Sequence, residues 1–208
     1  MNSMHSRCLE FIGSKAQELI LEGVSVYLSN KTSINNKYGG TFSSYDKMFK
    51  VAMGSGDDSV FTFIHEYSHF LQFKHRPEFW NENFFNGAEI YLRWLDSGSS
   101  KGFEVEDVFS KFVTLEHDAQ QIALSVVTSH SLPLNLAYCT KTANIHLLFL
   151  SWTRLSKTWN NGDFPKWHDG MTSKVPTELL PISQLTDMKQ SKKILNKIGI
   201  TNCFNKKN

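Results

Sequence analysis

The stretch that decides the fold is Phe61-Thr62-Phe63-Ile64-His65-Glu66-Tyr67-Ser68-His69-Phe70-Leu71, which contains the pattern His-Glu-x-x-His. Apolar and small residues recur in it at helical spacing, so it predicts an α-helix with a buried face. Residues four apart lie on the same side of a helix, which brings the rings of His65 and His69 together. Two neutral imidazoles at this spacing are good ligands for Zn²⁺. The sequence therefore predicts a zinc site on this helix.

Glu66 follows the first histidine directly and is the expected catalytic base. A carboxylate at this position can activate a zinc-bound water and later pass the proton to a leaving amine. The expected function is therefore zinc-dependent hydrolysis of a peptide bond. The oxyanion that forms needs a further hydrogen-bond donor, and Tyr138 is one candidate for it. The sequence does not choose between it and four other candidates, which are Tyr91, His130, His146 and His168.

A catalytic zinc ion usually takes three protein ligands, so a third residue must join the two histidines. Glu116 is the expected one, because it lies in a predicted helix over residues 104–128. Ala119 and Ala123 share its side of that helix, and small residues there would allow close packing against the first helix.

Two other residues remain open as the third ligand. Glu89 follows His69 at the spacing of thermolysin-like enzymes. His75 completes a three-histidine pattern that resembles the metzincins, but Gln72 stands where that family has glycine. A residue with a Cβ resists the sharp turn that would bring His75 back to the metal, and a glutamine favours continuing the helix.

The remaining sequence predicts a mainly helical α+β fold, with a small sheet next to the His-Glu-x-x-His helix. Residues 7–22 have helical spacing of apolar side chains, while residues 24–29 and 48–53 alternate as strands do. Residues 30–46 are rich in Asn, Ser, Lys and Gly and predict a loop. We expect residues 48–53 to offer a free strand edge to which an extended peptide substrate could bind.

Composition and charge favour one globular domain with a short tail. The chain has 208 residues, is 40% hydrophobic and carries a net charge of +2. We expect a catalytic domain over residues 1–187 and a basic tail over residues 188–208. The tail contains no acidic residue and carries Lys189, Lys192, Lys193, Lys197, Lys206 and Lys207. We expect no nucleic-acid partner, unless this tail contacts the phosphates of one.

Cysteines and apolar runs indicate the compartment. Cys8, Cys139 and Cys203 are far apart and form no Cys-x-x-Cys pair, which predicts neither a disulfide framework nor a thiolate zinc site. The sequence has no apolar run of the kind found in signal peptides or membrane spans. We expect a cytoplasmic protein with no membrane partner.

Three segments together resemble a group of small metallopeptidases that are common in bacteriophage genomes. They are residues 65–72, residues 115–119 and residues 138–144. The segment from Glu116 to Ala123 is also similar to the third-ligand helix of gluzincin peptidases that cleave phage repressors. The resemblance implies a zincin-like fold with His65, His69 and Glu116 on zinc and Glu66 as base. It also implies a protein or peptide substrate and, for a phage protein, the host cytoplasm.

An alternative from another functional class fits the same sequence. The chain could be a catalytically silent protein with a zincin fold that acts by binding a host protein. It would use the aromatic-rich segment over residues 78–96 or the basic tail for that contact.

Overall fold

The computed structural model describes residues 5–34, 39–54, 56–76, 80, 94, 102–156 and 170–200. Contacts divide the chain into two units. Unit 1 contains Met1–Trp80 and Ala119–Leu136, and unit 2 contains Asn81–Asp118 and Ala137–Asn208. Helix α4, Gly102–Ser129, is continuous through the boundary. The predicted mainly helical α+β class is confirmed.

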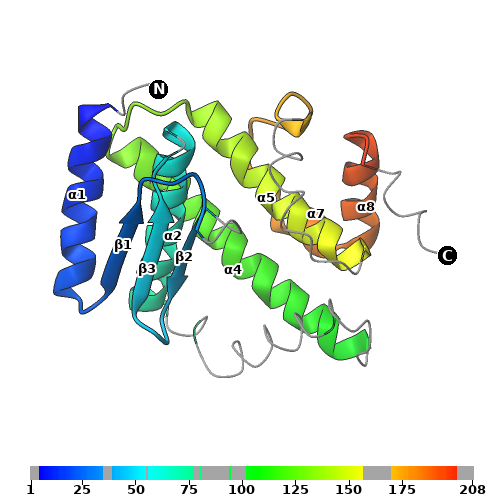
Figure 1. Ribbon diagram of the computed structural model, residues 1–208. Helices are drawn as coiled ribbons and strands as arrows, with labels where there is room; N and C mark the ends of the chain where they lie inside the picture. Colours follow the sequence, from blue (N-terminus) through cyan, green and yellow to red (C-terminus); the bar gives the residue numbers. More distant parts are fainter. Residues whose placement is uncertain are drawn as a thin grey trace. The chain divides into compact units, whose positions relative to one another are not determined.

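Unit 1 is built around a three-stranded mixed sheet in the order β1-β3-β2 (Figure 1). Strand β1, Ser25–Ser29, runs parallel to β3, Met48–Ala52. Strand β2, Gly40–Ser43, runs antiparallel to β3. Residues Phe49 and Val51 of β3 are completely buried, as expected for side chains that alternate toward the core. The sheet therefore has its most buried strand in the middle.

The central position of β3 overturns our expectation that residues 48–53 form a free edge. This strand is hydrogen-bonded to β1 on one side and to β2 on the other, so it has no edge to offer. Strand β2 lies inside the segment 30–46 that we predicted as a loop, and that prediction is wrong for Gly40–Ser43. A short strand that begins with glycine gives almost no alternating signal, whereas pairing with β3 supplies its backbone hydrogen bonds.

Helix α2, Asp57–His75, is the predicted His-Glu-x-x-His helix, and its existence is confirmed. It contacts β2 and β3 and lies behind the sheet in Figure 1. The Phe63 ring packs edge-on against Phe49 of β3, with their centroids 5.0 Å apart. Helix α1, Ser6–Leu21, contacts both β1 and α2. Because α2 is buried on most of its sides, the side chains that it carries are held in a rigid setting.

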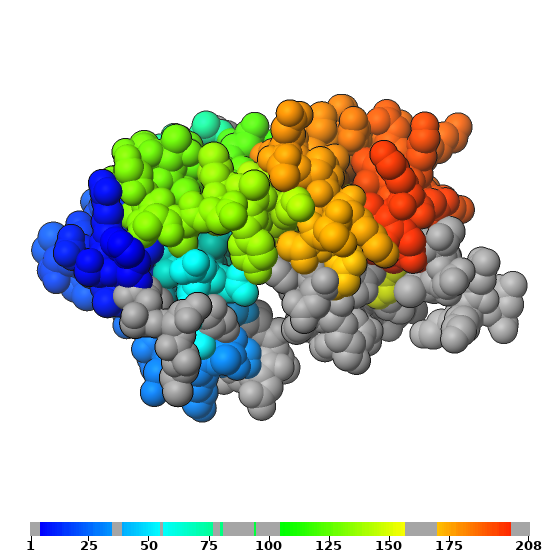
Figure 2. Space-filling view, turned by 90° about the horizontal axis from the view of Figure 1, so that it is seen from above, coloured from blue at the N-terminus to red at the C-terminus, as the bar shows by residue number. Residues whose placement is uncertain are grey.

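Unit 2 packs the first part of α4 with α5, Leu136–Ser156, around one hydrophobic core. The short helix α7, Ile182–Thr186, and helix α8, Met188–Lys197, complete it. Leu195 of α8 is fully buried in this core. The lysines of α8 are exposed, and this helix belongs to the orange-red part of the surface in Figure 2. The first part of the predicted basic tail thus contributes to the packing of unit 2. The domain limits that we expected stay a prediction.

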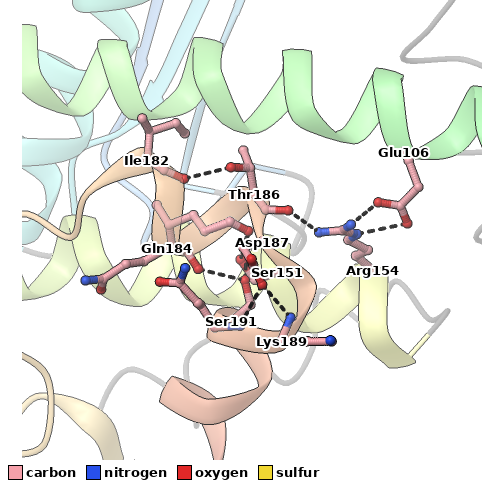
Figure 3. Close-up of polar contacts among 11 residues, drawn as sticks. Glu106, Ser151, Arg154, Ile182, Gln184, Thr186, Asp187, Lys189 and Ser191 are labelled. Atoms are coloured by element: carbon pink, nitrogen blue, oxygen red, sulfur yellow. Dashed lines mark hydrogen bonds and ion pairs between the residues drawn. The ribbon is translucent and has the colours of Figure 1, made fainter.

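A polar network ties α5 to the α7–α8 segment in unit 2 (Figure 3). The buried guanidinium of Arg154 pairs with Glu106 and donates from Nη1 to the Thr186 carbonyl at 2.9 Å. Ser191 donates from its hydroxyl to the Leu185 carbonyl at 2.8 Å. These bonds satisfy carbonyls at the junction of two short helices, where no helical partner exists for them.

None of the described helices is both long and apolar enough to cross a bilayer. Cys8 and Cys139 are buried, and Cys203 lies outside the described residues, as does most of the aromatic-rich segment 78–96.

Candidate metal centre

Helix α2 places His65 and His69 on one side, one turn apart. The helix continues without interruption from Asp57 to His75, so these two residues, four apart in the sequence, lie next to each other on its surface. The two imidazole rings meet edge to face with their centroids 4.6 Å apart. Their exposed fractions are only 8% and 7%. Two buried imidazoles this close can bind one ion.

Glu116 completes a group of three buried side chains with these histidines. The potential ligand atoms of His65, His69 and Glu116 all lie within 4.8 Å of one another. Glu116 lies on α4 one turn before Ala119, and both residues are buried. Two imidazole nitrogens and one carboxylate oxygen form the donor set of many catalytic zinc sites. These three residues could therefore hold a metal ion, although imidazole and carboxylate suit several divalent metals.

The other two third-ligand candidates are not part of this group. His75 is the last residue of α2 and is exposed, because the helix runs straight through Gln72. Because position 72 is not a glycine, we predicted that the helix would continue through it. Glu89 lies outside the described residues.

The predicted base, Glu66, is buried and lies directly against strand β2. A Cβ atom at Gly40 would come within 2.8 Å of Glu66 Cγ and 3.1 Å of its Oε1. It would also come within 2.9 Å of the Thr62 methyl group. A glycine is needed here because no other residue allows the strand and the helix to approach so closely. Sequence reasoning missed this role of Gly40, and the glycine pair at positions 39 and 40 was its only signal.

Gln72 contacts the second histidine of the motif. Its Oε1 lies 2.9 Å from His69 Nδ1, and its side chain is completely buried. In the sequence, Gln72 stands out only as the residue at the metzincin glycine position, and its i,i+3 spacing from His69 on a helix was the signal that could have predicted this pair.

His146 of α5 lies near the carboxylate of Glu116 in unit 2. Its Nδ1 is 3.9 Å from Glu116 Oε2, and its side chain is 30% exposed. His146 is thus an oxyanion candidate that lies close to a predicted ligand. Tyr138 is half-buried in the first turn of α5, and its role stays a prediction. His130 packs against Phe11 at 5.0 Å, while Tyr91 and His168 lie outside the described residues.

One side chain of α4 and one of α5 form hydrogen bonds to the segment 176–180. The residue on α4 is His117, which follows Glu116 directly in the sequence. The fully buried Asn144 donates to the carbonyls of Pro176 and Glu178 at 3.0 and 2.9 Å. It also accepts from the Leu180 backbone N–H at 2.8 Å. His117 Nε2 lies 2.9 Å from the Leu180 carbonyl, which can only accept, so this nitrogen donates. These bonds hold the part of α4 that carries the predicted third ligand.

In comparisons with known proteins, no family model, curated protein or solved structure matches the chain. The resemblance to phage metallopeptidases therefore stays an expectation, and function must be argued from the residues of the site.

Proposed function

We propose that this protein is a zinc-dependent peptide hydrolase with a zincin-like fold. The observation that carries the proposal is the buried group of His65, His69 and Glu116, in which the ligand atoms lie within 4.8 Å of one another. The adjacent Glu66 supports it, because this carboxylate is buried beside the first ligand and has its position limited by β2. The phage metallopeptidase resemblance agrees with this function.

The residues have distinct roles in the proposed reaction. A zinc ion held by His65, His69 and Glu116 would supply a Lewis acid and a water acidic enough to ionise near neutral pH. Glu66 would take the proton of that water on its carboxylate and transfer it to the nitrogen of the leaving group. Burial strengthens the electrostatic interaction between this carboxylate and the proton that it accepts, since charges interact more strongly where water is excluded.

For the developing oxyanion we propose His146 as a candidate donor alongside Tyr138. A donor for this charge must lie near the metal ligands, and His146 approaches Glu116 to 3.9 Å. Its partial exposure also leaves the ring accessible to a substrate.

An extended peptide could bind along the outer edge of β2. Within the described residues, β2 is paired with β3 on one side alone. Main-chain hydrogen bonds to such an edge hold a peptide without regard to its sequence. Because Gly40 of β2 lies against Glu66, a peptide on this edge would pass close to the proposed base.

The test combines metal analysis with hydrolysis. We expect the purified protein to contain about one zinc ion per chain. We expect it to cleave a broad peptide library and to lose this activity in the presence of a chelator. Glu66→Gln should keep the zinc and lower hydrolysis by at least about 100-fold. Glu10→Gln on the exposed side of α1 is the matched control and should change neither quantity.

Two outcomes would contradict the proposal. Undiminished cleavage by Glu66→Gln would remove this residue from the role of base. Zinc binding without cleavage of any peptide would instead favour the catalytically silent binding protein that the sequence also allowed.

A further inference from the structure

Gln72 is a buried polar side chain with a specific partner. The residue is fully inaccessible to solvent, and its Oε1 lies 2.9 Å from Nδ1 of His69. Burying an amide is unfavourable unless it forms hydrogen bonds, so an apolar side chain would fill the same space at lower cost. The polarity of this position is therefore explained by what the amide binds.

The chemistry of the contact fixes the proton of the histidine. An amide oxygen can only accept a hydrogen bond, so His69 must donate from Nδ1. A neutral imidazole has one proton, and with that proton on Nδ1 it is Nε2 that carries the lone pair able to bind a metal. A free neutral imidazole prefers the opposite arrangement, with its proton on Nε2.

The neutrality of the amide matters as well. In many metal sites, a carboxylate accepts the hydrogen bond from the ring nitrogen of a ligating histidine that does not bind the metal. Here Glu116 supplies one carboxylate to the group, and Glu66 is a second buried carboxylate next to His65 in the sequence, so two negative charges are already present for a divalent ion. A third buried negative charge would add a large desolvation cost. Glutamine supplies the acceptor without the charge.

We propose that Gln72 is a positioning residue that holds His69 in the Nδ1-protonated form, with its orientation fixed, so that Nε2 binds the metal. The inference rests on the metal site of the proposed function, but it does not require that the protein hydrolyses peptides. It also accounts for the glutamine at the position where metzincins have glycine: here the residue supports the second ligand by continuing the helix.

The first measurement is the protonation of His69 in the metal-free protein. Nitrogen-15 NMR of the imidazoles, at a pH where the ring is neutral, should show the proton of His69 on Nδ1. In Gln72→Met, which keeps the length of the side chain and removes the acceptor, the proton should shift toward Nε2. A wild-type ring protonated on Nε2 would overturn the inference, and this measurement needs no variant to fold.

The second measurement is zinc affinity by competition with a chelator. Gln72→Met should bind Zn²⁺ about 10- to 100-fold more weakly than the wild type. Gln72→Glu restores an acceptor oxygen and should recover part of the lost zinc affinity in the folded protein, while the added buried charge lowers the free energy of unfolding. Ser68→Ala is the matched control, since this buried hydroxyl of α2 donates to the Ile64 carbonyl at 2.8 Å and should leave zinc binding unchanged.

The outcomes separate this inference from the proposed function. Wild-type zinc affinity in folded Gln72→Met would overturn the role of Gln72. A wild-type protein that binds zinc through this site and cleaves nothing would overturn the hydrolase and leave the role of Gln72 intact.

Discussion

Gly40 of β2 and Glu66 of α2 lie so close together that a Cβ at position 40 would approach Glu66 Cγ to 2.8 Å. The backbone of a strand thus forms one wall around the carboxylate that we propose as the base. An active-site group must be held within a fraction of an ångström of its productive position. In this molecule the backbone at a glycine sets one limit on that position.

We predict that Gly40→Ala displaces Glu66 and lowers hydrolysis by about 10- to 100-fold, because a misplacement near 1 Å is enough for this effect. Zinc content should be unchanged, since Glu66 is not among the three ligands. The measurements are peptide hydrolysis and bound zinc for the same preparation.

The control for this substitution is Gly13→Ala in α1, where an added Cβ meets nothing within 4 Å. Alanine inside a helix should raise the free energy of unfolding by about 0.5–1 kcal/mol and leave hydrolysis unaffected. Wild-type hydrolysis by Gly40→Ala would show that the strand does not restrain Glu66.

Much of unit 1 could be predicted because its elements carry strong periodic patterns. Helix α2 follows from the spacing around His65 and His69, and β3 follows from the alternation over residues 48–53. Strand β2 could not be predicted, because a short strand is formed by pairing with β3 and not by its own propensity. Because β2 was not predicted, β3 was expected to be an edge strand.

The site divides in a similar way. The ligand pair and Glu66 follow from one local motif, and Glu116 could be proposed from small residues on its side of α4. The contacts of Gly40 and His146 could not be predicted, since each joins residues that are distant in the sequence. Such contacts depend on how elements pack, which periodicity does not encode.

The third ligand can be distinguished by two substitutions. We predict that Glu116→Gln, which keeps the shape and removes the charge, weakens zinc binding by at least about 100-fold, more than is typical for loss of an outer partner. His75→Ala should leave zinc affinity unchanged, because His75 is exposed at the end of α2. Chelator competition measures both. If His75→Ala lost zinc while Glu116→Gln kept it, His75 and not Glu116 would be the third ligand.

The contact between α1 and α2 predicts a pH-dependent stability. Tyr67 donates from its hydroxyl to Glu18 at 2.9 Å. Burial by itself raises the pKa of Glu18, but hydrogen bonds from Lys15 and Tyr67 outweigh this effect and lower the pKa below its ordinary value. A lowered pKa means that the stabilisation is present above the ordinary glutamate pKa, about 4.3, and is lost as the pH falls through the folded-state value.

We therefore predict that Tyr67→Phe lowers the free energy of unfolding by about 1 kcal/mol at pH 7, and by less at pH 3. Thermal unfolding over this range gives both values. Tyr27→Phe, at a residue that is 54% exposed, is the control and should have little effect at either pH. An equal effect of Tyr67→Phe at pH 3 and pH 7 would contradict the charge-assisted hydrogen bond.

The bond pattern of Asn144 predicts that this single side chain stabilises unit 2 strongly. Its amide satisfies two carbonyls and one N–H of the segment 176–180. Asn144→Leu keeps the volume but leaves these backbone groups without their side-chain partner. Each unsatisfied buried group costs about 1–3 kcal/mol, so we expect a loss near 3 kcal/mol and a melting temperature lower by about 6–12 °C.

Asn144→Asp gives the sharper comparison. A carboxylate can still accept from the Leu180 N–H, but its oxygens would face the carbonyls of Pro176 and Glu178, which repel it. It should therefore destabilise the protein at least as much as leucine does. Thr128→Ala, at an exposed hydroxyl of α4, should change the melting temperature by about 1 °C or less. If aspartate instead restored wild-type stability, the two carbonyl bonds would have no energetic role, and the stabilising contact would be the single bond to Leu180.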